Sequence, residues 1–239
     1  MNVLDLFSGI GGFSLGLERA GMKTVAFCEI EPYPQAVLRK NFPGVPIYDD
    51  VRTISAERLA TDGIGRVDLV CGGFPCQPFS NAGKRRGKDD DRFLWPEMLR
   101  IVQEFQPTWV IGENVAGFID MALCDVSFDL EAAGYEVQSL VIPACAVGLP
   151  HRRDRVWIMA HNQEKRPIKG MESVPKGRLP REFGRVDFNS WENWLDSTVV
   201  TTEYAGIPPW LGELECYGNT VTPLIPEIIG NIIMEIEGF

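Results

Sequence analysis

A cysteine enclosed by prolines is the residue of this chain best suited to nucleophilic chemistry. Cys76 lies between Pro75 and Pro78 and follows the glycine pair Gly72-Gly73. Prolines stiffen a chain and glycines commonly end a strand, so we expect a stiff, exposed loop here rather than a core position. A reactive thiol needs access and surroundings that favour the thiolate. Cys76 is therefore a candidate nucleophile, and the alternative is a loop cysteine without a role.

Basic residues follow this loop and could favour a thiolate. Five Lys and Arg stand against three Asp between positions 84 and 92, and ten stand against four carboxylates in residues 151–185. The net charge of −10 argues at first sight against a nucleic-acid partner. Two basic islands on an acidic chain could nevertheless bring a phosphate backbone to one face. On charge alone, two solvated loops explain the pattern equally well.

A carboxylate and two arginines are the next candidates. Glu113 follows the apolar run 109–111, where partial burial would raise its pKa toward that of a useful acid. Alternatively, it caps a following helix. Arg153 and Arg155 alternate along an expected extended segment, so both side chains point to one side and could hold one substrate. The alternative for the arginines is a salt-bridged surface turn.

A glycine-rich turn and a later carboxylate indicate a nucleoside cofactor. The glycine turn, residues 8–12 (Ser-Gly-Ile-Gly-Gly), follows the apolar run 3–7 and lets a ligand approach backbone amides closely. Glu29 ends the next expected strand and could accept hydrogen bonds from ribose hydroxyls, as an acid about 20 residues on does in dinucleotide folds. A nicotinamide enzyme, or simple tight packing, fits this pattern nearly as well.

These candidates share a position at the ends of expected strands. Strands are expected at 3–7, 24–27, 67–71, 109–111, 137–142 and 155–160, and helices at 13–22, 32–42, 94–105 and 225–236. This alternation predicts an α/β fold with a doubly wound, mainly parallel sheet. Ligands of such sheets bind outside the carboxyl ends of the strands. We therefore expect the candidate residues to meet at one sheet edge.

One stretch breaks the alternation. Residues 162–210 are rich in Pro, Gly and Arg, contain three Trp and show no sustained periodicity. We expect a main domain at 1–161, a small irregular lobe at 162–210, and a C-terminal segment at 211–239 that returns to the main domain.

Composition excludes several classes of protein. Hydrophobic residues make up 45% and charged residues 23%, and no apolar run approaches the ~20 residues that cross a bilayer. The first residues lack the pattern of a signal peptide. Six scattered Cys without a C-x-x-C pair, and two His, do not form a zinc pattern. We expect a cytoplasmic protein with reduced thiols and no metal.

Taken in order, three segments resemble the DNA (cytosine-5)-methyltransferase family. They are Asp-Leu-Phe-Ser-Gly-Ile-Gly-Gly at 5–12, Phe-Pro-Cys-Gln-Pro-Phe-Ser at 74–80 and Glu-Asn-Val at 113–115, within a resemblance that covers 1–160 and 215–239. The resemblance implies the Rossmann-like fold of S-adenosylmethionine-dependent methyltransferases, with 162–210 as a target-recognition lobe. It implies methyl transfer from S-adenosyl-L-methionine to C5 of a cytosine flipped out of double-stranded DNA.

The resemblance also implies roles for individual residues. Cys76 would add covalently to C6 of cytosine, and Glu113 would contact its N3/N4 edge, with Arg153 and Arg155 assisting from O2. Glu29 would hold the ribose and Asp50, or alternatively Asp49, the adenine. The implied cofactor-binding set is Phe7, Gly9, Ile10, Gly11, Gly12, Glu29, Ile30, Asp50, Val51, Pro75, Leu94, Asn219 and Val221. The implied DNA contacts are Ser80, Lys84, Arg85, Arg86 and Lys88.

The chain departs from the family pattern in three places. His151 replaces the usual Gln before the paired arginines, the Arg-rich recognition element is reduced to 178–182, and the lobe is unusually short. An active enzyme of a restriction-modification or phage system therefore competes with a partner-dependent or non-catalytic binding subunit and with an RNA-directed enzyme. We expect a monomer whose partners are double-stranded DNA and, as candidates, a separate recognition subunit or a cognate restriction nuclease. An amino-methyltransferase would need an Asn/Asp-Pro-Pro-aromatic segment in place of residues 73–76, and an oxidoreductase leaves Cys76 unexplained.

Overall fold

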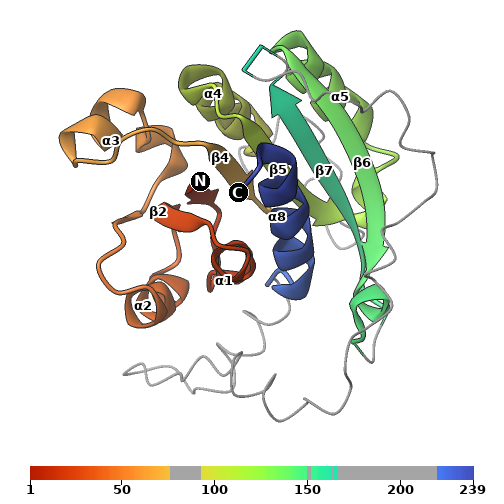
Figure 1. Cartoon of the computed structure of the whole chain (residues 1–239), viewed down its shortest axis with the longest axis horizontal. Coiled ribbons are helices and arrows are strands. Elements are labelled where there is room, and N and C mark those ends of the chain that lie inside the picture. The colour runs from red at the N-terminus through yellow and green to blue at the C-terminus, as the bar shows by residue number, and fades with distance from the viewer. Residues whose placement is uncertain (76–92, 150–151, 163, 166–219) are drawn as a thin grey trace.

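A seven-stranded sheet forms the centre of the part of the chain that the structure describes. The computed structural model describes residues 1–75, 93–149, 152–162, 164–165 and 220–239 (Figure 1). Across these residues the strand order is β3-β2-β1-β4-β5-β7-β6. The strands are β1 Asn2–Leu6, β2 Lys23–Cys28, β3 Ile47–Tyr48, β4 Leu69–Gly72, β5 Trp109–Val115, β6 Tyr135–Pro143 and β7 Asp154–Asn162.

Only β7 runs against the other strands of this sheet. The pairs from β3 to β5 are parallel, whereas β7 pairs antiparallel with both β5 and β6. Val115 at the end of β5 therefore lies opposite Arg155 near the start of β7. The predicted mainly parallel sheet is confirmed. The reversed strand brings residues 152–155, which we call the arginine segment, to the edge of the sheet where the parallel strands have their carboxyl ends.

Helices cover both faces of the sheet, as a doubly wound fold requires. They are α1 Gly12–Arg19, α2 Pro32–Asn41, α3 Ala56–Thr61, α4 Trp95–Phe105, α5 Leu123–Ala132 and α8 Leu224–Glu237. Side chains of β1 alternate between two cores: Leu4 packs with residues of α3, α4 and α5, and Val3 packs with residues of α1 and α8. Figure 1 shows α8 lying across the sheet beside α1.

The contact between α1 and the segment before α8 is made by backbone. A Cβ atom at Gly12 would lie 2.3 Å from the carbonyl oxygen of Val221, and one at Gly16 would lie 2.2 Å from that of Pro223. Any larger residue at these positions would collide with main-chain atoms. The glycines thus allow residues 221–223 to lie directly on the first helix.

Most predicted elements are confirmed, with shifted ends. Strand β3 and helices α3 and α5 were not predicted from the sequence, and β5 was predicted to end at 111, although the strand continues through Glu113 to Val115. The predicted division of the chain into residues 1–161, 162–210 and 211–239 stays a prediction, because residues 166–219 lie outside the described part. Among the described residues, no helix is long and apolar enough to cross a membrane. The same residues hold no group of three or more His, Cys, Asp or Glu side chains placed to bind a metal.

Candidate active site

The predicted functional segments meet at the carboxyl edge of the sheet. The glycine turn follows β1, Glu29 follows β2, Gly73 follows β4, and Glu113 lies near the end of β5. These strands are neighbours in the order β2-β1-β4-β5. The structure therefore brings together the segments that the sequence placed at strand ends.

The glycine turn and Phe7 directly before it have a left-handed backbone at three positions. Phe7 and Gly9 both have φ of 53°, and Gly11 has φ of 90°. At Gly9 a Cβ would meet nothing within 4 Å, so the backbone angle rather than crowding favours glycine there. Ser8 fixes the turn, since its hydroxyl donates to the Asp5 carbonyl at 2.7 Å and its N–H donates to the Cys28 carbonyl at 3.0 Å. The turn then leads into the N-terminus of α1 at Gly12.

Glu29 joins the glycine turn to the end of β2. Its Oε2 accepts the Gly9 N–H at 2.7 Å and its Oε1 accepts the Glu31 N–H at 2.8 Å. Burial raises the pKa of Glu29, while these backbone hydrogen bonds act in the opposite direction. A carboxylate offers about four lone-pair sites, so Glu29 keeps acceptor capacity for a ligand hydroxyl. Ile30 beside it is 69% exposed, an apolar surface at the edge of the site.

Strand pairing brings the chain before Asp50 and Val51 beside Glu29. Cys28 pairs with Tyr48, and the Glu29 N–H donates to the Tyr48 carbonyl at 2.9 Å, so the turn after β3 begins beside Glu29. We call residues 50–54 the Asp50 turn. Asp50 caps it by accepting the Arg52 N–H at 2.9 Å. Leu94, at the start of α4, packs against the core cluster that contains Val51.

Asn114 fixes the chain that leads to Cys76. Its Nδ2 donates to the Phe74 carbonyl at 3.0 Å, and its Oδ1 accepts the Val115 N–H at 2.9 Å. The Phe74 ring is buried against Trp95 and Phe118, with ring centroids 5.2 and 5.4 Å away. Both the carbonyl and the side chain of Phe74 are therefore held, two residues before Cys76.

Glu113 pairs with an arginine in a buried position. Its Oε1 lies 2.9 Å from Nε of Arg155, and a Cβ on Gly73 would lie 3.2 Å from its Oε2. Burial raises the pKa of Glu113 to about 7, against the attraction of Arg155 and Arg153, which lowers it. The pKa of Arg153 is lowered, first by burial and then by Arg155. This part of the site thus combines an acid of near-neutral pKa, Glu113, with the cations Arg153 and Arg155.

The alternatives from the sequence are wrong for Glu113 and for Arg155. Glu113 does not cap a helix, since Val115 occupies the cap position of the short helical turn Ala116–Phe118 and no side chain caps it. The surface ion pair of the arginine segment is made by exposed Arg152, 3.0 Å from Asp154, whereas Arg155 turns to Glu113.

The C-terminal segment reaches the glycine turn. The Val221 carbonyl and the Thr220 side chain are the atoms nearest to the Cβ position of Gly12. Val221, predicted as a cofactor residue, therefore lies beside the residues after β1. The predictions for Cys76, Ser80, Lys84, Arg85, Arg86, Lys88, His151 and Asn219 lie outside the described residues.

Asp5 and Asn114 have structural roles that were not predicted from the sequence, although both residues belong to the quoted motifs. Asp5 is fully buried on β1, and its Oδ2 accepts the Ser14 hydroxyl of α1 at 2.7 Å. Burial raises the pKa of Asp5 to about 7. Asp5 thus ties the first turn of α1 to the sheet below the glycine turn.

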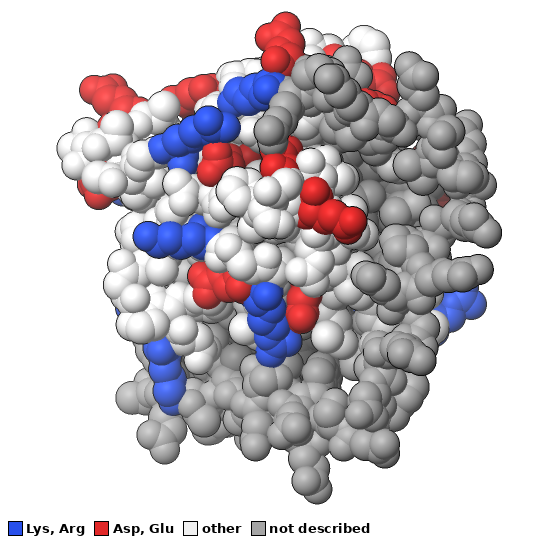
Figure 2. Space-filling view, viewed as in Figure 1, with Lys and Arg blue, Asp and Glu red and all other residues white. Residues whose placement is uncertain are grey.

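Charges on the described surface are mixed. Figure 2 shows Lys and Arg interspersed with Asp and Glu over the described residues of one face. The described residues of this face therefore offer no single basic field for a phosphate backbone. The predicted DNA-binding lysines and arginines at 84–88 lie outside the described part.

Known proteins match this chain over most of its length. The family model for C-5 cytosine-specific DNA methylases matches residues 1–200. The Type II methyltransferase M.NgoMIV of Neisseria gonorrhoeae is 36% identical over 216 residues, which are 87% of this chain and 67% of that protein. The Type II methyltransferase M2.BsuMI of Bacillus subtilis is 38% identical over 169 residues, which are 67% of this chain and 42% of that protein.

A solved structure agrees with these matches. A DNA modification methyltransferase encoded within an E. coli prophage superposes with a TM-score of 0.60 at 31% identity, covering 69% of this chain and 47% of that chain. The chain thus spans about two thirds of one curated relative and less than half of the other relative and of the solved structure.

Proposed function

Because the chain belongs to the C-5 cytosine-specific DNA methylase family, we propose that it transfers a methyl group from S-adenosyl-L-methionine to C5 of a cytosine in DNA. The observation that carries the proposal is the position of Glu113. This acid has a pKa of about 7, pairs with Arg155, and has its Oε2 3.2 Å from the Cβ position of Gly73, three residues before the candidate nucleophile Cys76. The relatives named as Type II methyltransferases support DNA as the substrate and a restriction-modification setting.

The residues at the sheet edge fit S-adenosyl-L-methionine. The glycine turn and the N-terminus of α1 present backbone N–H groups, which suit the carboxylate of the methionine portion. Glu29 keeps acceptor capacity for the ribose hydroxyls, and exposed Ile30 offers an apolar surface to one face of the adenine. Asp50, rather than Asp49, would accept from the adenine amino group. When bound, the cofactor supplies an electrophilic methyl group.

The remaining cofactor residues surround these groups. Phe7, Pro75 and Leu94 would pack against the cofactor from β1, β4 and α4, and Val51 supports the adenine side from its buried position. Val221 closes the methionine side over Gly12, and Asn219 would hydrogen-bond near it.

Cys76 would perform the covalent step on the substrate. Its thiolate adds to C6 of cytosine, forming the S–C6 bond while the electron pair of the C5–C6 double bond moves to make C5 nucleophilic. C5 would then bond to the methyl carbon as the bond from that carbon to the sulfonium sulfur breaks, with S-adenosylhomocysteine as the leaving group. A base would remove the C5 proton, the C5–C6 double bond would reform, and Cys76 would leave as thiolate. The base needed at the end is a water molecule in this proposal.

Glu113 and the arginines would stabilise the ring during this addition. A protonated Glu113 carboxyl donates to N3 and accepts from the N4 amino group, which offsets charge that develops on the ring. A pKa of about 7 keeps a large fraction of Glu113 protonated at neutral pH. Arg155 and Arg153 would contact O2, and Arg155 also holds the Glu113 carboxyl in place through its 2.9 Å contact.

DNA binding is the remaining part of the proposal. C5 of cytosine cannot be reached inside a duplex, so the base must flip out at a cost of a few kcal/mol. Ser80, Lys84, Arg85, Arg86 and Lys88 would contact phosphates. Residues 162–210 would read the sequence, with a separate recognition subunit or a cognate nuclease as candidate partners. In this proposal the chain acts as a monomer in the cytoplasm.

The deciding experiment is a product assay with the full chain. Incubation with labelled S-adenosylmethionine and duplex DNA of varied sequence should yield 5-methylcytosine at defined positions in bisulfite sequencing. Cys76→Ser should remove the product and the covalent adduct with 5-fluorocytosine DNA. Binding of S-adenosylmethionine without product on any DNA would contradict the enzyme and favour a DNA-binding subunit. Product on RNA alone would show that the substrate is RNA and not DNA.

A further inference from the structure

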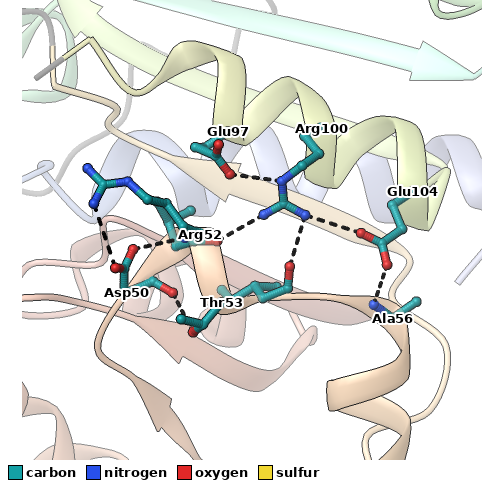
Figure 3. Close-up of polar contacts among 9 residues, drawn as sticks. Asp50, Arg52, Thr53, Ala56, Glu97, Arg100 and Glu104 are labelled. Carbon is teal, nitrogen blue, oxygen red and sulfur yellow. Dashed lines mark hydrogen bonds and ion pairs between the residues drawn. The ribbon is translucent and has the colours of Figure 1, made fainter. Parts of the chain in front are cut away.

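An arginine of α4 bridges that helix to the Asp50 turn (Figure 3). The Arg100 guanidinium donates from Nη2 to the Val51 carbonyl at 3.1 Å and from Nη1 to the Ile54 carbonyl at 3.0 Å. These carbonyls lie 49 and 46 residues away in sequence. One side chain therefore holds both ends of the turn against a different element.

Two glutamates of α4 hold the guanidinium in place. Glu97 accepts from Nε at 2.8 Å and Glu104 accepts from Nη1 at 3.2 Å, one turn before and one turn after Arg100. The other oxygen of Glu104 accepts the Ala56 N–H at 2.7 Å. Helix α4 thus contacts the backbone at Val51, Ile54 and Ala56. Figure 3 shows Arg100 and Glu104 pointing from α4 toward this part of the chain.

The geometry favours a positional role over a purely energetic one. Partly exposed ion pairs contribute little to stability, with a median of about 0–1 kcal/mol. A guanidinium, however, presents five N–H donors in a rigid planar fork. Two carbonyls and two carboxylates around one group use this fork, and the three donors of a lysine ammonium cannot reproduce it.

The same helix carries a second group of the cofactor site. Leu94 is the residue from which α4 begins, and it packs on the core cluster that includes Val51. Arg100 therefore fixes Asp50 and Val51 relative to Leu94. Inside the turn, the Thr53 hydroxyl donates to the Asp50 carbonyl at 2.7 Å. Because Thr53 lies between the two residues that Arg100 holds, this hydrogen bond also restrains Asp50.

We infer that Arg100 is a positioning residue for the adenine end of the cofactor site, acting through the Asp50 turn. This inference rests on the proposed function, which assigns the adenine to Asp50 and Val51. Without Arg100 the Ile54 carbonyl would lose this donor, and the Val51 carbonyl would keep only the Ile54 N–H at 3.3 Å, so the turn would be held less firmly against α4. Part of the binding free energy would then be spent on ordering the turn, so affinity for the cofactor would fall.

Other contacts keep the turn folded when Arg100 is changed. Arg58 of α3 donates to the Thr53 carbonyl at 3.3 Å, and within the turn the Ile54 N–H donates to the Val51 carbonyl at 3.3 Å. Loss of Arg100 should therefore change the placement of the turn rather than unfold the domain.

The test compares Arg100→Met and Arg100→Lys with Arg39→Met in the full chain. Arg39 is a matched control, because its hydrogen bond to Gln35 at 2.8 Å stays within α2. We expect Arg100→Met to raise the dissociation constant of S-adenosylmethionine about tenfold in calorimetry, equivalent to about 1.4 kcal/mol. Arg100→Lys should restore little of this affinity, and Arg39→Met should bind as the wild type does. The KM for the cofactor should rise while kcat at saturating cofactor stays unchanged.

A double variant separates action through the turn from a general effect. If Arg100 acts through the Asp50 turn, the loss in Arg100→Met combined with Asp50→Ala should be smaller than the sum of the single losses. Backbone amides at 51–56 should also exchange hydrogen faster in ligand-free Arg100→Met. Should Arg100→Met fail to fold, Glu104→Gln, which weakens the link to Ala56, should show a smaller rise in the same dissociation constant.

The outcomes distinguish the two proposals. Wild-type chain that does not bind S-adenosylmethionine overturns both the cofactor assignment and the role of Arg100. Wild-type binding with unchanged affinity in folded Arg100→Met overturns the positioning role alone. Additive losses in the double variant also overturn it.

Discussion

The Glu113 carboxylate lies 2.9 Å from the Arg155 guanidinium although the two residues belong to strands that run in opposite directions. Because β7 is antiparallel to β5, Arg155 near its start reaches the same sheet edge as Glu113 near the end of β5. In an all-parallel sheet the start of a strand would lie at the opposite edge. The single reversed strand of the described sheet therefore assembles the acid and the arginines.

Glu113→Gln should lower kcat/KM for methyl transfer by about 10²–10⁴-fold, because glutamine cannot supply a proton to the ring. Burial raises the pKa of Glu113 to about 7, so its protonated fraction falls as pH rises through that value. Wild-type kcat/KM should therefore contain a limb that declines above about pH 7, which Glu113→Gln lacks. Rates measured across this range test the prediction, with Glu131→Gln on the exposed side of α5 as a control. A wild-type profile without a declining limb would contradict it.

Asn114→Ala should lower kcat and leave the dissociation constant of S-adenosylmethionine unchanged. The variant removes the donor to the Phe74 carbonyl, so the chain before Cys76 loses its fixed position. An unsatisfied buried carbonyl should also lower the free energy of unfolding by about 1–3 kcal/mol. Single-turnover rates and urea unfolding measure the two effects. Asn231→Ala, at an exposed position of α8, should change neither, and equal kcat in both variants would exclude the role of Asn114.

Gly12→Ala should destabilise the protein more than Gly9→Ala. At Gly12 the new Cβ would lie 2.3 Å from the Val221 carbonyl, so the segment before α8 must move, at a cost of about 1–3 kcal/mol or more. At Gly9 there is open space, and only the φ of 53° makes alanine unfavourable, by about 1–2 kcal/mol. Urea unfolding of both variants and their affinity for S-adenosylmethionine give the comparison. An equal or smaller loss at Gly12 would show that residues 221–223 do not rest on α1.

Asp5→Asn should flatten part of the pH dependence of stability. Burial raises the pKa of Asp5 from its ordinary 3.8 to about 7, so the folded chain binds this proton more tightly than the unfolded chain does. The contribution is therefore full at low pH, and the free energy of unfolding falls as pH rises between these values. Asn keeps an oxygen for the Ser14 hydroxyl without titrating. Urea unfolding at about pH 5 and about pH 7.5 should show Asp5→Asn gaining stability relative to wild type at the higher pH. Parallel curves would be inconsistent with a titrating Asp5.

The sequence predicted the sheet edge well, for a physical reason. Strands β1 and β4 are buried on both faces and appear as short apolar runs, and the glycine turn and Glu29 follow such runs directly. Helix α3 was missed because it has six residues and buries only Leu59, and β3 has two residues. Such elements form through tertiary packing and leave little periodicity in the sequence.

Contacts between distant segments could not be predicted in the same way. Asn114 acts on Phe74, 40 residues earlier, and Arg100 acts on Val51, 49 residues earlier. Neither pair has a local pattern that joins its members. Their roles depend on the sheet order, which places β4 beside β5 and α4 beside the Asp50 turn.

The backbone contact between Gly12 and Val221 has a consequence for how proteins of this kind diversify. Strand β7 ends at Asn162, whose N–H donates to the Thr108 carbonyl at 3.0 Å, and the chain is anchored again where Val221 rests on α1. Between two such anchors, doubling the length of a connection costs only about 0.6 kcal/mol of closure entropy. The stretch between these anchors can therefore change in length and sequence during evolution at little cost to folding. In the proposed enzyme, such a change would alter the DNA sequence that is read and leave the cofactor site as it is.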